Sequence, residues 1–285
     1  MVRRLAATTC WIAVLFAAVG CGDQRSVADA GPVERPTAVP GATGIVTTRQ
    51  PVVVSDDGSG PQLCFGSYSF GGPPDCSDAA VPGWDWTEHA GAFEESNGVR
   101  WGSFLLTGTF DGESFEPTDV DPPSSSPYTP DFSIPCPEPA GGWQVEDPAR
   151  ATREQLTSLS SVAEDLPDHA LTAVSTVEGA PGPRDPAETV VTVYVAGDPA
   201  GAERALREVW GGMLCVTEVE HSHADLERIQ QSLIGLPGML QVGSGNPDNQ
   251  VELTVFHDDG RYQRWVDAEY GEGVVEVTSI LQPVD

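Results

Sequence analysis

The chain has 285 residues, of which 43 are acidic and 14 are basic, so its formal net charge is −29 at pH 7. All of the basic residues are arginine, and removing the two near the N-terminus takes the charge to −31. So acidic a protein repels phosphate backbones and anionic headgroups, which excludes nucleic acid as an expected partner. Beyond the first 20 residues, no segment approaches the roughly 18 apolar residues of a membrane helix.

Residues 1–20 have the features of a secretory leader. Two arginines precede an apolar run, and small residues lead into Cys21. The run is short for a membrane span, and its flanks are typical of a segment removed during export. A single membrane anchor and a secreted protein cut near Ala18 are the alternatives.

The segment Ala18-Val19-Gly20-Cys21 resembles the lipobox of bacterial lipoprotein leaders, with Ala18 at the position that leucine usually holds. This resemblance implies that Cys21 becomes the lipid-modified N-terminus of the mature protein. The membrane would then be a partner through the lipid anchor, and the folded part would lie outside the cytoplasm.

Residues 21–43 lack hydrophobic periodicity and are rich in Pro, Ala and Gly, which predicts a flexible tether. Residues 44–120 predict a small β domain of about five short strands. Its clearest signal is the alternating segment 99–110, followed by a hairpin turn at Asp111-Gly112. We expect a barrel-like fold, with an OB-type barrel as one form of it. Residues 121–150 are rich in Pro and Ser and predict a linker.

Four cysteines remain outside the leader: Cys64, Cys76, Cys136 and Cys215. An even number in an oxidising compartment favours disulfides, although four cysteines allow three connectivities. Because Cys64 and Cys76 close a short loop rich in Gly and Pro, we pair them, which leaves Cys136 for Cys215. Their spacing is not that of a zinc site.

Residues 151–285 predict alternating helices and strands. Thr152, Asp198 and Ser222 stand where helix N-caps are expected, and either Asp258 or Asp259 opens a last helix. At an offset of 60 residues, 190–218 aligns without gaps onto 250–278, with five identities. The same order of strand, Asp cap, helix and strand in both segments predicts two stacked units. The fold class expected is therefore α+β: the small disulfide-bonded β-barrel-like domain, then an α+β sandwich of ferredoxin-like character.

Several short stretches resemble an uncharacterised group of actinobacterial secreted or lipid-anchored proteins. They lie at 63–66, 73–76, 83–86, 108–112 and 210–216. The resemblance supports the location and the disulfides, and it implies no chemistry.

His221-Ser222-His223, with Glu220 and Asp225 beside it, is the densest histidine cluster in the sequence. A His-x-His pair with nearby carboxylates can chelate zinc or copper, so His221, His223 and Asp225 are weak metal-site candidates. The competing interpretation is that Ser222 caps a helix.

Two further groups of residues are candidates for binding. An acidic run could hold calcium, although a solvated hairpin edge explains it as well, and three tryptophans could line a ligand groove, although core packing explains them better. They are Asp111, Glu113, Glu116, Asp119 and Asp121, and Trp84, Trp86 and Trp101.

No nucleophile elbow, phosphate loop or dinucleotide fingerprint is present in the sequence, so we assign no catalytic residue and expect no cofactor. The function expected is a non-catalytic binding or interaction module, with an envelope protein or a cell-wall ligand as partner. The alternative is a secreted hydrolase or metal-dependent enzyme with a site near His221 and His223. A third hypothesis, a folding or inhibitor module for a secreted protease, rests on fold analogy alone.

Overall fold

The computed structural model describes residues 33–64, 74, 76, 78–123, 133–177 and 185–284. The chain divides into two compact units, residues 1–32 and residues 33–285. The leader and Cys21 therefore lie outside the described residues.

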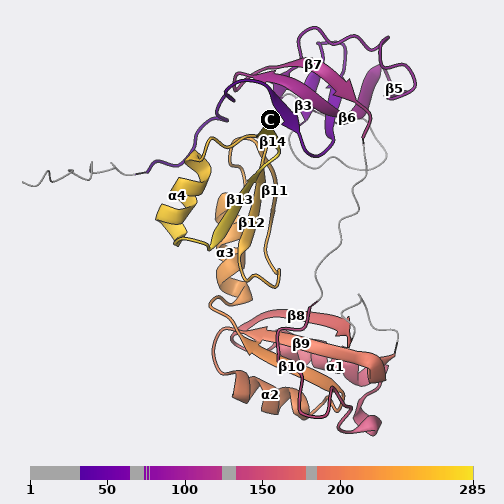
Figure 1. Ribbon diagram of the computed structural model, residues 1–285, viewed down its shortest axis with the longest axis vertical. Helices are drawn as coiled ribbons and strands as arrows, with labels where there is room; N and C mark the ends of the chain where they lie inside the picture. Colours follow the sequence, from indigo (N-terminus) through magenta and orange to yellow (C-terminus); the bar gives the residue numbers. More distant parts are fainter. Residues whose placement is uncertain are drawn as a thin grey trace, which may run out of the picture. The chain divides into compact units, whose positions relative to one another are not determined.

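An eight-stranded sheet occupies the N-terminal part of the second unit (Figure 1). The central strand is β6 (Val99–Phe110), which pairs with β1 and β2 on one edge and with β5 and β7 on the other. The remaining strands are β1 (Val46–Thr48), β2 (Val52–Asp56), β3 (Gln62–Cys64), β4 (Ala79–Ala80), β5 (Glu94–Ser96), β7 (Phe115–Asp121) and β14 (Leu281–Pro283).

This sheet curls into a half-barrel. All of its strand ladders are antiparallel, and the amide of Ala80 in β4 reaches the carbonyl of Glu113 at 3.1 Å in the β6–β7 turn. The alternating side chains of β6 place Phe104, Leu106 and Phe110 in the core. Gly108 sits at a register shift between β6 and β7, where an added Cβ would come within 2.1 Å of the Glu116 carbonyl. The barrel-like β domain is thus present as an open, curled sheet.

One strand of this sheet comes from the other end of the chain. β14 pairs with β1, so that Thr48 lies opposite Leu281, and both Ile280 and Leu281 are buried in the same core as Phe104. A pairing between such distant segments leaves no local sequence signal. The predicted β domain ended at residue 120 and therefore did not include β14.

Part of the predicted tether is packed. Within residues 33–43, Pro36 and Pro40 are buried, and the Arg35 guanidinium lies 5.2 Å from the ring centre of Trp265. The Arg35 side chain also donates to the Ser232 carbonyl at 3.2 Å. These contacts move the start of the packed chain from residue 44 to residue 33.

The remainder of the chain forms two units of one design, which we call repeat 1 (residues 152–218) and repeat 2 (residues 222–279). Each runs helix, strand, strand, helix, strand. Repeat 1 contains α1 (Arg153–Glu164), β8 (His169–Thr176), η2 (Pro186–Glu188), β9 (Thr189–Val195), α2 (Pro199–Arg207) and β10 (Met213–Glu218). Repeat 2 contains α3 (His223–Leu233), β11 (Met239–Gly243), β12 (Val251–Val255), α4 (Arg261–Tyr270) and β13 (Val275–Ser279).

The two sheets are built alike. The middle strand of each pairs antiparallel with the first strand and parallel with the third. Each first strand also carries a register shift at its second residue, Ala170 in β8 and Leu240 in β11. In each repeat both helices pack against one face of the sheet (Figure 1). The α+β class is therefore confirmed.

The ferredoxin-like sandwich is not confirmed. A ferredoxin-like sheet places another strand between the two strands of each βαβ unit. Here β9 and β10 are adjacent, as are β12 and β13, and the repeats form two separate three-stranded sheets.

The repeat extends further than the aligned segment indicated. Leu156, Leu166 and Pro167 recur 70 residues later as Leu226, Leu236 and Pro237. The offset falls from 70 to 60 mainly because both β8 and its connection to β9 are longer than β11 and its connection to β12. A gapless alignment could not cross that change.

The predicted helix caps are confirmed. Thr152, Asp198 and Ser222 each accept a hydrogen bond from a backbone amide three residues later. Thr152 and Gln155 also bond through their side chains. The N-cap position of α4 is Gly260, and Asp258, two residues before it, accepts from the amides of Gly260 and Tyr262, both at 2.9 Å.

Both predicted disulfides are present, Cys64–Cys76 and Cys136–Cys215. The second fastens residues 133–147, which we call the strap, to the face of the repeat 1 sheet opposite the helices. Ile134 and Trp143 of the strap pack against Val190 and Met213 of that face. Part of the predicted linker is thus a packed cover, and it ends in a short 3₁₀ helix, η1 (Pro148–Arg150).

Candidate functional site

The histidine candidates lie where repeat 1 connects to repeat 2. His221 lines a pocket of about 410 Å³. The other lining residues come from the connection between the repeats, the loop before β12 and the loop after α4. They are Val219, Glu220, Pro247, Asp248, Asn249, Tyr270, Gly271, Glu272, Gly273 and Val274.

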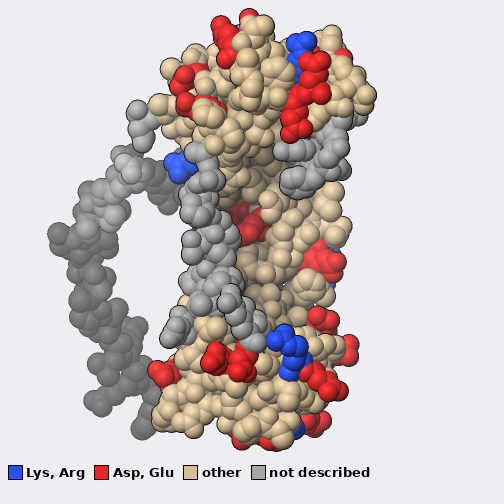
Figure 2. Space-filling model, turned by 90° about the vertical axis from the view of Figure 1, so that its right-hand side faces the viewer, with Lys and Arg blue, Asp and Glu red and all other residues tan. Residues whose placement is uncertain are grey.

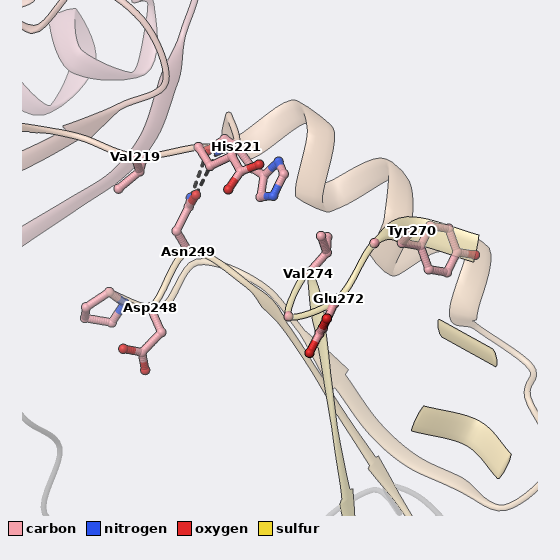
Figure 3. A pocket seen from close by; sticks show the side chains of 11 residues that line it. Val219, His221, Asp248, Asn249, Tyr270, Glu272 and Val274 are labelled. Atoms are coloured by element: carbon pink, nitrogen blue, oxygen red, sulfur yellow. Dashed lines mark hydrogen bonds between the residues drawn. The ribbon is translucent and has the colours of Figure 1, made fainter. Parts of the chain in front are cut away.

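Asn249 fixes the connection at this pocket. Its amide oxygen accepts from the His221 backbone amide at 2.8 Å, and its amide nitrogen donates to the His221 carbonyl at 2.8 Å (Figure 3). Asn249 has φ = 58°, a left-handed conformation that asparagine tolerates better than most residues. Our sequence analysis did not single out Asn249, because a lone asparagine in a polar loop carries no distinctive pattern.

The labelled ionisable side chains of the pocket, His221, Asp248 and Glu272, point in different directions. Figure 3 shows the His221 ring turned away from Asn249, while the carboxylates of Asp248 and Glu272 point in other directions. A general acid–base pair needs side chains within hydrogen-bonding reach of one reacting group. Neither Asp248 nor Glu272 therefore forms such a pair with His221.

The other two metal candidates serve the N-terminus of α3. The Ser222 hydroxyl donates to the Asp225 carboxylate at 2.6 Å, and Arg228 donates to its other oxygen at 3.0 Å. These bonds, the Ser222 bond foremost, hold the pKa of Asp225 below its usual range. His223 is the first residue of α3 and does not line the pocket. The structure thus does not bring His221, His223 and Asp225 together around one point.

His223 does influence a histidine of repeat 1. The pKa of His169 is lowered, first by burial and then by the positive charge that His223 can carry. The His169 Nε2 atom lies 3.0 Å from the Thr172 hydroxyl. Within the described ranges, no group of three or more His, Cys, Asp or Glu side chains could hold a metal ion.

The three candidate tryptophans do not share a groove. Trp86 is buried, and its indole nitrogen donates to Asp56 at 3.1 Å. Trp84 packs edge-on against Trp86 and Phe104 in the core of the curled sheet. Trp101 is an odd number of residues from Phe104 on β6, so it lies on the opposite face of that strand.

The acidic hairpin is explained by its turn. One oxygen of Asp111 accepts from the amides of Glu113 and Ser114, at 2.9 and 2.7 Å, and the other accepts from the Ser114 hydroxyl. These bonds lower the pKa of Asp111. Acidic side chains are also spread widely over the molecular face in Figure 2, with arginines at few places. The hairpin is thus one part of a generally acidic surface.

Comparison with known proteins gives no family for this chain. No protein-family model matches it, and no match was found among curated proteins.

Proposed function

We propose that this chain is a membrane-anchored extracytoplasmic lipoprotein that serves as a non-catalytic binding or interaction module of the cell envelope. Its partner would be an envelope protein or a cell-wall ligand. The observation that carries the proposal is the pair of disulfides, because such bonds form and persist in oxidising compartments outside the cytoplasm. No helix in the part of the chain that the structure describes is long and apolar enough to cross a membrane.

The lipobox-like segment supplies the anchoring part of the proposal. Stable attachment requires more than one acyl chain, which the lipoprotein modification of Cys21 would provide. The described chain begins at residue 33, so eleven residues lie between it and Cys21. Fully extended, they span at most about 40 Å, which keeps the residues around Arg35 close to the bilayer.

The binding role is supported by the structural roles of the polar residues that were candidates for chemistry. Asp225, Ser222 and Asp111 are engaged in helix caps and turns. The carboxylates of Asp248 and Glu272 point in other directions than the His221 ring.

A secreted hydrolase or metal-dependent enzyme remains the second candidate, because His221 lines a pocket of adequate size. It predicts stoichiometric zinc or copper in the purified protein, lost in His221→Ala with His223→Ala. The binding-module proposal predicts no such metal and an unchanged melting temperature on adding EDTA.

The anchor is tested by comparing the parent with Cys21→Ser in membrane fractions and by intact mass. We expect the parent in the membrane fraction with an acylated N-terminus, and the variant without that mass. If both proteins fractionate alike and carry the same N-terminal mass, the lipoprotein proposal is wrong.

A further inference from the structure

A second pocket, of about 460 Å³, lies between the strap and the repeat 1 sheet. Trp143 and Val145 of the strap form one side. Residues at the end of β8, in η2 and at the start of β10 form the other: Thr176, Val177, Ala187, Glu188 and Met213. The volume falls within the range typical of small-molecule sites.

The pocket walls are mainly apolar and partly open to solvent. Met213 is 3% exposed, whereas Val177 is 46% exposed. Large aliphatic side chains exposed to this extent are few among the described residues. An apolar cavity with an exposed valine retains surface that a ligand can remove from water.

The charged residue in the lining of the pocket determines which ligand charge the pocket favours. Glu188 is the one ionisable residue among the described lining residues, and it is exposed. Trp143 is half-buried in the same lining. An indole face and a carboxylate beside apolar walls are the groups that recognise alkylated ammonium ions. The net charge of −29 attracts cations and repels anions.

We propose that the strap pocket binds an organic cation, specifically an ammonium whose nitrogen carries alkyl groups. The alkyl chain contacts Met213 and Val177, and the charged end lies between the Trp143 ring and the Glu188 carboxylate. The proposal gives a ligand class to the binding role proposed above, but it requires neither the lipid nor the membrane.

Repeat 2 provides an internal control. By strand register, Leu214 and Val275 are equivalent, because they pair with the equivalent residues Val191 and Val251. Cys215 and Thr217 therefore correspond to Glu276 and Thr278, which are both exposed. Glu252 on β12 is exposed on the same face of the sheet. Glu252→Gln therefore removes the same charge as Glu188→Gln at a position that does not line the strap pocket.

The test is calorimetric titration of the purified, disulfide-bonded protein with hexyltrimethylammonium. 1-Hexanol and hexanoate are the uncharged and anionic comparators. We expect saturable one-to-one binding of hexyltrimethylammonium, and no saturable binding of 1-hexanol or hexanoate. Glu188→Gln should weaken it about three- to fivefold, the effect of one partly exposed ion pair. Trp143→Leu should weaken it by about fivefold or more, and Glu252→Gln should leave it unchanged.

Three results would overturn the proposal: no saturable binding, binding of hexanol as tight as the cation, or equal weakening by Glu188→Gln and Glu252→Gln. Because Trp143→Leu can disturb the strap, its fold is checked by near-ultraviolet circular dichroism. Glu188→Gln is exposed and carries the test by itself. The Cys21→Ser experiment can fail without changing this titration, and the titration can fail without changing the location.

Discussion

Repeats 1 and 2 share strand pairing, the register shift in the first strand and the Asp cap of the second helix, yet they are stabilised by different partners. In repeat 1 the sheet face opposite the helices carries Val190, Met213 and Cys215, and the strap covers it. The same face of repeat 2 carries Glu252, Glu276 and Thr278, all exposed. Most of its buried apolar residues lie on the helix side, whereas Leu240 of β11 packs against the core of the curled sheet.

The ends of the middle strands also differ. Phe256 follows β12 and is buried in the core of the curled sheet, with its ring centre 5.0 Å from that of Phe110. The equivalent residue after β9 is Ala196, which is only partly buried. Repeat 2 therefore packs against the N-terminal sheet through a side chain that repeat 1 lacks.

This comparison shows that the backbone pairing does not decide where the apolar residues fall. A face that a covalently held segment covers is apolar, and a face that meets solvent is polar. Four changes follow from this difference, from the largest expected effect to the smallest.

Replacing both Cys136 and Cys215 by serine should have the largest effect. The bond closes a loop with a sequence separation of 79 residues, for which chain entropy predicts about 4 kcal/mol of stabilisation. Urea unfolding of the double variant measures the loss. A loss under about 1 kcal/mol, within the range of an ordinary point mutation, would show that the strap adds little to stability.

Phe256→Ala should lower the free energy of unfolding by about 3–4 kcal/mol, because it opens a cavity in a packed core. The matched control is Ala196→Ser at the equivalent position of repeat 1, where a change within about 0.5 kcal/mol is expected. Equal effects in the two repeats would contradict the docking role of Phe256.

The two helix caps should differ in strength. Asp258 accepts from three backbone amides, whereas Asp198 accepts from the amide of Gly201 alone and its side chain is 71% exposed. We expect Asp258→Ala to cost about 1–2 kcal/mol and Asp198→Ala about 0.5 kcal/mol. Thermal unfolding monitored by circular dichroism gives the order, and the reverse order would refute this interpretation.

A smaller effect should appear on acidification. The pKa of His257 is lowered mainly by burial, and to a smaller extent by the positive charge of Arg261. The carboxylates of Asp259 and Asp258 raise this pKa, but their effect is smaller than that of burial. His257 lies against the Phe110 ring and is 8% exposed. Below the ordinary histidine pKa of about 6.5 the unfolded chain binds a proton that the folded chain resists, so stability falls as the pH falls.

His257→Asn removes this titration while keeping a polar side chain. We expect the loss of stability between pH 7.5 and pH 5.5 to be smaller in the variant than in the parent. Parallel pH profiles for parent and His257→Asn would contradict the assignment.

Local patterns predicted much of this fold. The Asp111-Gly112 turn, the caps at Thr152, Asp198 and Ser222, and both disulfides follow from short-range chemistry, and the structure confirms them. Each depends on residues close in sequence or, for the second disulfide, on elimination.

The missed features depend on contacts between distant segments. β14 pairs with β1 across the length of the chain, and the strap is recognisable only once its sheet face is known. The gapless sequence alignment did not find the first half of the repeat, because the offset between the two repeats changes there from 70 to 60 residues. At the candidate site, His-x-His was a local pattern that the cap at Ser222 explains, and Asn249 acts through backbone groups of a distant loop.

The central claim is that one scaffold is stabilised by the strap in repeat 1 and by the curled sheet in repeat 2. Hydrogen–deuterium exchange on the parent and on Cys136→Ser with Cys215→Ser tests it most directly. The account predicts that the variant loses amide protection in β8, β9 and β10 while β11, β12 and β13 keep theirs. An equal loss of protection in both sheets, or a loss in neither, would contradict it.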